Sequence, residues 1–169
     1  MDENLIIPEN YPELMQMFIG EEIYLVNESQ WYESIPSEGG NKYRFLNVFS
    51  HAGNEIIPEE KRDFFFKMVN AIRTDRIQMD ADGFAAINVQ NCKGLKWKNL
   101  EHLFSPRYCI FWGADPNTMD VPCKPGGGTV VNDCRILYFP SLDKVDADTD
   151  MKRQLWNYMQ RMFGMTAPK

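Results

Sequence analysis

Basic side chains are missing from the first part of this sequence. The first 40 of its 169 residues contain nine acidic side chains and no lysine or arginine, whereas the remaining residues carry 15 acidic and 18 basic ones. The net charge of −6 therefore hides an acidic leader on a slightly basic body. A secretory signal starts with positive charge. Because Met1-Asp2-Glu3-Asn4 is acidic, we expect a cytoplasmic protein.

Long apolar runs are also missing. No stretch approaches the roughly 18 residues that cross a bilayer, so we expect no membrane association. Hydrophobic residues make up 44% and charged residues 25% of the chain, which is ordinary globular composition. A chain of 169 residues also fits the usual single-domain range of roughly 100–200 residues. We expect an acidic and apolar leader over residues 1–20 and a single domain over residues 21–169.

Close pairs of metal-binding residues are absent. The four cysteines lie 17, 14 and 11 residues apart, and neither of the two histidines has a second histidine or cysteine three or four residues away. Zinc ribbons and iron–sulfur sites normally need at least one close pair. We therefore expect no metal site, no cofactor and mostly buried thiols at the positions Cys92, Cys109, Cys123 and Cys134.

A phosphate-binding loop is not expected either, although Pro125-Gly126-Gly127-Gly128-Thr129 invites the comparison. In such a loop a Gly-Lys-Ser/Thr sequence leads into a helix, so that the lysine reaches the phosphates. Here Lys124 precedes the glycines, and β-branched residues follow them. The pattern favours a flexible turn.

What the sequence does contain is an alternation of strand and helix patterns. Strands are predicted at residues 22–26, 43–49, 84–89, 108–112 and 135–139, and amphipathic helices at 58–73, 95–103 and 148–163. Strands that alternate with helices are typical of a parallel sheet covered by helices. The predicted fold is α/β, a three-layer α/β/α sandwich with a mainly parallel sheet of four to five strands.

Polar residues follow two of these strands. His51 comes just after the strand 43–49, which contains Asn47, and Asp115 leaves the strand 108–112 through Gly113-Ala114. Ligands of open α/β sheets bind at this carboxyl edge, so Asn47, His51 and Asp115 are candidate catalytic residues. Asp115 is alternatively a turn cap, as Asp-Pro commonly is, and His51 a solvated loop residue. The loop 114–128 is also a candidate small-ligand site.

The leader carries apolar residues at partly helical spacing, interrupted by two prolines, and they form the candidate partner-binding set: Ile7, Tyr11, Leu14, Met15 and Phe18. A segment of this kind packs on its own body or docks into a partner's groove. Its acidic residues favour a basic protein partner, or they serve solubility alone. Both alternatives stay open.

The last third of the chain resembles the uracil-DNA glycosylase superfamily. The strand ending in Gly113-Ala114, the strand leading into Phe139-Pro140-Ser141 and the final helix with Trp156 and Gln160 follow the order of that family. The resemblance implies a degenerate pocket at Gly113, Ala114, Asp115, Phe139 and Ser141. It also places the family's catalytic histidine at Phe139, which cannot donate a hydrogen bond. As a glycosylase, the protein is expected to be inactive.

Over its whole length the chain resembles the psi subunit family of bacterial DNA polymerase III, small non-catalytic α/β proteins with an N-terminal peptide. The features that match are the leader through Ile19, the strand end at Phe111-Trp112-Gly113 and the helix Lys152–Phe163. In that family the peptide docks on the clamp loader and the body binds the chi subunit. The resemblance implies a protein–protein adaptor in DNA replication or repair.

Two further functions stay open beside the adaptor. One is a divergent uracil-glycosylase-like nucleobase hydrolase that uses Asp115 and His51, and the other is a small-ligand-binding domain. The body's small positive charge indicates at most weak direct nucleic-acid binding, since many phosphate contacts dominate such affinity.

Overall fold

Six strands form one sheet in the computed structural model, which describes residues 32–90 and 92–165. Their order across the sheet is β1-β3-β2-β4-β6-β5. The strands are β1 (Ser37–Glu38), β2 (Phe45–Phe49), β3 (Phe84–Asn88), β4 (Tyr108–Trp112), β5 (Gly128–Val131) and β6 (Cys134–Phe139). The predicted leader and the predicted strand at 22–26 lie outside the described residues.

The four central strands are parallel, and the edge strands β1 and β5 pair antiparallel to them. The mainly parallel sheet is therefore confirmed, but the predicted count of four to five strands is too low. β1 has only two residues, and β5 begins at the end of the predicted glycine turn. Asn132 and Asp133 form a tight turn in which both residues have positive φ, and this turn folds β5 back on β6. The residues of β5 themselves give no local signal of this pairing.

Alternation along the strands divides the core into two faces. Phe45 and Phe49 of β2 pack toward one face, and Leu46 and Val48 toward the other. Every residue of β2 is buried, as expected for a strand covered on both sides. The sheet is thus the middle layer of three.

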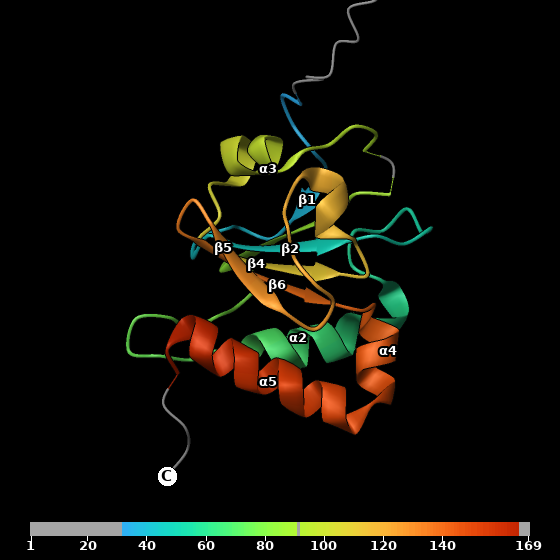
Figure 1. Ribbon diagram of the computed structural model, residues 1–169. Helices are drawn as coiled ribbons and strands as arrows, with labels where there is room; N and C mark the ends of the chain where they lie inside the picture. The colour runs from blue at the N-terminus through green and yellow to red at the C-terminus, as the bar shows by residue number, and fades with distance from the viewer. Residues whose placement is uncertain (1–31, 91, 166–169) are drawn as a thin grey trace, which may run out of the picture.

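Helices cover both faces (Figure 1). On one face lie α2 (Arg62–Asn70), α4 (Leu142–Ala147) and α5 (Thr149–Phe163), and on the other lie α3 (Trp97–Phe104) and the short 3₁₀ helix η2 (Pro116–Met119). From β2 the chain crosses to β3 through α2, then returns past β2 to β4 through α3. Because such crossovers are right-handed, reversing direction puts the two helices on opposite faces.

The helix ends agree with the sequence where local caps decide them. Asp148 accepts hydrogen bonds from the backbone N–H groups of Asp150 and Met151, and Gly164 ends α5 with a φ of 67°. The predicted helix 58–73 is shorter: a 3₁₀ turn, η1 (Glu59–Lys61), precedes α2, which ends at Asn70. The predicted loop 114–128 contains η2, and α4 has no counterpart among the predicted helices. Among the described residues, no helix has the length and hydropathy needed to cross a bilayer.

Candidate functional site

The carboxyl ends of β2, β4 and β6 meet at one edge of the sheet, and two hollows open there. The first, which we call the His51 hollow, has a volume of about 380 Å³ and is lined by residues that include His51, Glu55, Glu59, Trp112, Ser141 and Asp143. The second, the Asp115 hollow, has about 310 Å³ and is lined by residues that include Cys92, Lys96, Gly113, Ala114, Asp115 and Thr118. Edges of this kind hold the ligands of open α/β sheets.

His51 uses both ring nitrogens within its own loop. The backbone N–H of Gly53 donates to Nδ1 at 3.2 Å, and Nε2 lies 3.1 Å from the carbonyl oxygen of Ile56. With Nδ1 accepting from Gly53, Nε2 is the ring nitrogen placed to donate a hydrogen bond to the carbonyl oxygen of Ile56. The imidazole is therefore engaged in holding its loop rather than free to take a proton from a substrate.

Asn88, the last residue of β3, holds the same loop from the neighbouring strand. Its Nδ2 donates to the carbonyl oxygens of His51 and Gly53, each at 3.1 Å, and of Glu55 at 3.2 Å, while its Oδ1 accepts from the backbone N–H of His51 at 3.3 Å. Sequence reasoning missed this residue. The available signal was an amide side chain at the carboxyl end of a predicted apolar strand.

Asp115 caps η2. Its Oδ1 accepts from the backbone N–H of Asn117 at 2.9 Å and from Asn117 Nδ2 at 2.8 Å, and its carbonyl oxygen accepts from the hydroxyl of Thr118 at 2.7 Å. Of the two alternatives for this residue, the structure displays the turn cap. Asp115 and His51 line different hollows, which share Ser50 in their lining.

Asn47 and Phe139 are core residues. Asn47 is fully buried in β2, its Oδ1 accepts from Trp112 Nε1 at 3.0 Å, and its Nδ2 has no partner among the described residues. Phe139 is 1% exposed, with ring centroids 6.4 Å from Trp112 and 6.1 Å from Tyr158. The position where the resemblance implies a catalytic histidine is thus part of an aromatic cluster.

Gly113 and Ala114 follow the end of β4, and Ser141 follows the end of β6 by two residues. Gly113 has a φ of +66°, and a Cβ there would come within 3.3 Å of the Ser141 side chain. Glycine at position 113 therefore allows the chain leaving β4 to pass close to Ser141. Ala114 is buried. Ser141 precedes α4 without capping it through its side chain, and it lines the His51 hollow.

Four acidic residues line the His51 hollow: Glu55, Glu59, Glu60 and Asp143. Next to it, Lys61 and Lys152 both bind Asp146, at 2.8 and 2.9 Å. These hydrogen bonds, the one from Lys61 first, lower the pKa of Asp146. The two lysines are thus engaged with Asp146. Nowhere in the described part of the chain do three histidine, cysteine or acidic side chains gather to hold a metal.

The cysteines all lie on the α3 side of the sheet, as free thiols. Cys109, Cys123 and Cys134 are buried, whereas Cys92 is partly exposed. Burial raises the pKa of the Cys109 thiol well above its usual range and that of Cys134 to about 12. The predicted buried thiols are confirmed at three of the four positions.

Thiol labelling is expected to follow this burial. Because the thiolate is the reactive form, iodoacetamide at mild alkaline pH is expected to modify Cys92 first and to leave Cys109 and Cys134 unmodified until the protein unfolds. Peptide mass spectrometry with and without denaturant measures this order. Labelling of Cys134 at the rate of Cys92 in the native protein would contradict it.

A third hollow, of about 350 Å³, is an apolar groove between α2 and α5. Its lining includes Phe64, Met68, Leu155, Trp156 and Met159, and Lys67 and Lys152 also border it. We call it the α2–α5 groove.

Comparison of the sequence with models of known protein families gives no match, and comparison with curated protein sequences gives none either.

Proposed function

We propose that the protein is a non-catalytic adaptor that joins other proteins in DNA replication or repair, as a psi-like clamp-loader accessory subunit would. The observation that carries the proposal is that the candidate catalytic positions at the carboxyl edge of the sheet have structural roles. His51 is used within its loop, Asp115 caps a helix, and Phe139 packs in the core. A general acid or base must reach its substrate by a hydrogen bond, and these groups are engaged elsewhere.

The acidic leader is the segment that would bind the adaptor's first protein partner. Tyr11, Leu14, Met15 and Phe18 follow one another at spacings of three, one and three residues, which suits one face of a short helix docked in a partner's groove. The surrounding carboxylates would steer it to a basic partner, since complementary charge speeds encounter and excludes wrong partners.

The α2–α5 groove supports a second contact, which an adaptor needs. Its apolar lining and Lys67 at its border suit an amphipathic helix with an acidic flank, whereas Lys152, which also borders it, is paired with Asp146. The groove lies on the opposite face of the sheet from Tyr32, the first described residue, which packs on the α3 side.

Replacing Leu14 and Phe18 together with alanine in the full chain is expected to abolish recovery of the leader's partner. Pull-down with tagged wild-type protein, followed by mass spectrometry, identifies proteins that depend on the two side chains. Gln16→Ala is the matched control, because it shortens a polar side chain of the same segment and is expected to retain the partner. Equal recovery by wild type and the double variant would remove the leader from the proposal.

A divergent nucleobase hydrolase is the second candidate, favoured by one observation. The Ser141 hydroxyl lines the His51 hollow without capping α4, at the edge where α/β enzymes bind substrates. Release of free uracil from single- or double-stranded DNA by the wild type, abolished by Ser141→Ala, would favour this function over the adaptor.

A further inference from the structure

Three neighbouring parallel strands each have an arginine within one residue of their amino end. Arg44 directly precedes β2, Arg107 directly precedes β4, and Arg135 is the second residue of β6. The backbone N–H of Arg107 donates to the carbonyl oxygen of Arg44 at 2.8 Å, and that of Arg135 donates to the carbonyl oxygen of Arg107 at 3.0 Å. These bonds set the three residues in a row along the amino edge of the sheet, opposite to the carboxyl edge described above.

A hollow of about 410 Å³ opens beside this row, and four cations line it: Lys42, Arg44, Arg76 and Arg107. We call it the amino-edge hollow. All four side chains belong to exposed residues, and among the described residues no carboxylate lines the hollow. Arg135 is not part of the lining, and its guanidinium donates to the carbonyl oxygen of Met162 at the end of α5. Arg44 lines the hollow while its Nε donates to the carbonyl oxygen of Ser105.

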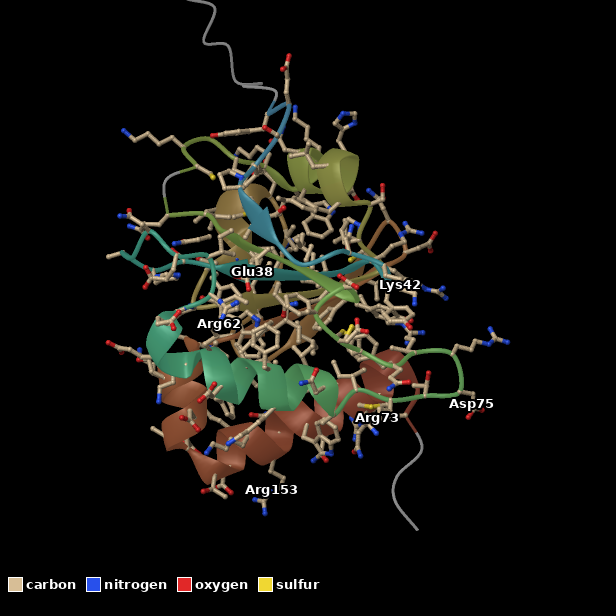
Figure 2. The ribbon with its side chains drawn as sticks, turned by 180° about the vertical axis from the view of Figure 1, so that it is seen from behind. Glu38, Lys42, Arg62, Arg73, Asp75 and Arg153 are labelled. Carbon is tan, nitrogen blue, oxygen red and sulfur yellow. The ribbon has the colours of Figure 1, made fainter. Side chains whose placement is uncertain are left out.

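The four cations have no acidic partners within residues 32–90 and 92–165. Ion pairs of the described residues engage other lysines and arginines, such as Arg62 with Glu38 and Arg153 with Asp150. Asp75, the acidic residue nearest Arg76 in sequence, lies at the outer tip of its loop (Figure 2). Like charges in one hollow repel one another, so an anionic ligand would relieve the repulsion.

The loop that presents Arg76 is braced. The hydroxyl of Thr74 accepts from the backbone N–H groups of Arg76 and Ile77, at 3.2 and 3.0 Å, and the backbone N–H of Thr74 donates to the carbonyl oxygen of Ile77 at 2.7 Å. Arg76 is thus held across the hollow from the strand ends rather than carried on a loose segment. A preformed arrangement loses less conformational entropy on binding.

Aromatic rings complete the lining. Tyr43 and Tyr108 are partly exposed, and Tyr108 is supported from the core by Phe163, with ring centroids 4.4 Å apart. A recess that combines several cations with aromatic side chains is the usual arrangement for single-stranded nucleic acid, whose phosphates need charge and whose bases stack on rings.

We propose that the amino-edge hollow binds single-stranded nucleic acid, with Lys42, Arg44, Arg76 and Arg107 contacting its phosphates. The hollow lies at the opposite edge of the sheet from the residues that a glycosylase would use, and the site needs neither the leader nor a protein partner. It therefore goes beyond the adaptor role, and each can fail without the other. A free nucleotide has the same phosphate chemistry and is distinguished by the experiment.

Fluorescence anisotropy tests the proposal with the full chain and a labelled oligothymidylate of about 16 nucleotides, within the site sizes known for single-strand binders. The variant Arg76→Glu/Arg107→Glu changes two exposed side chains and is expected to weaken binding about tenfold or more near 50 mM salt. The slope of log affinity against log salt is expected to fall by about 0.7 for each phosphate that the variant no longer neutralises. Circular dichroism verifies that the variant is folded.

Arg153→Glu is the matched control. It makes one arginine-to-glutamate change, half of the charge change of the double variant, at an exposed side chain on α5, away from the hollow (Figure 2). It is expected to change affinity less than about twofold, the range of a surface charge that touches no phosphate. No binding by the wild type near 50 mM salt, or an equal loss of affinity in both variants, would overturn the proposal. So would displacement of the oligonucleotide by equimolar thymidine monophosphate, since this would assign the hollow to a free nucleotide.

Discussion

Replacing Trp112 with alanine is expected to lower the free energy of unfolding by about 3–5 kcal/mol, the range measured for removing a buried aromatic side chain. Trp112 is 1% exposed, its ring stacks on Phe49 with centroids 6.2 Å apart, and Phe139 packs beside it. Removal leaves a cavity at the centre of the aromatic cluster. It also removes the one hydrogen bond that the Asn47 side chain makes within the described part of the chain, which places the expected loss of stability near the upper end of that range.

Urea unfolding followed by far-UV circular dichroism measures this loss. Trp112→Phe separates the two causes, because it keeps a ring but removes the donor to Asn47, and its expected cost is about 1–3 kcal/mol. Adding Asn47→Leu to that variant removes the amide that no longer has a donor, and stability is expected to recover in part. A Trp112→Ala protein within about 1 kcal/mol of the wild type, the size of an ordinary surface change, would show that the cluster is not the core.

Replacing Phe139 with histidine is expected to destabilise the protein by about 2–4 kcal/mol, because the change removes apolar burial and introduces a polar ring among aromatic neighbours. The loss is expected to grow as the pH falls below about 6.5, the pKa of an unperturbed histidine. The reason is that burial disfavours the charged ring in the folded state, so the unfolded state binds more protons in acid. Stability of the variant therefore rises with pH through this window.

Denaturation of the Phe139→His variant at several pH values between 5 and 8 checks the size and the sign. Tyr138→His is the matched control, since Tyr138 is the partly exposed neighbour on the same strand, on the α3 side of the sheet, and its expected loss of stability is smaller. A variant more stable at pH 5 than at pH 8 would contradict the burial argument.

The same Phe139→His protein bears on function. Because His51 and Asp115 line different hollows and are engaged within their own loops, restoring one histidine is not expected to create uracil release. Wild type and variant are both expected to be inactive on uracil-containing DNA. Uracil released by the variant alone would mean that the carboxyl edge keeps a functional glycosylase site apart from this one position.

The sequence by itself determined the elements whose signals are local. The apolar run Tyr108–Trp112 forms the strand predicted for it, and Asp148 and Gly164 bound the last helix as expected. Hydrophobic period and capping act within a few residues, so they can be recognised along the chain. The same local chemistry indicated that Asp115 could cap a turn, and it does.

Only the tertiary structure decided which distant residues meet. Strand pairing places β1 and β5 at the edges of the sheet. It also brings Trp112 within hydrogen-bond distance of Asn47 and Asn88 within hydrogen-bond distance of the His51 loop. It separated the two hollows at the carboxyl edge and aligned arginines from three strands at the other. The arginines are visible in the sequence at the start of each strand, but their alignment depends on strand order and register. Both are fixed by the packing of the whole core, and residues far apart in the chain carry no local signal of it.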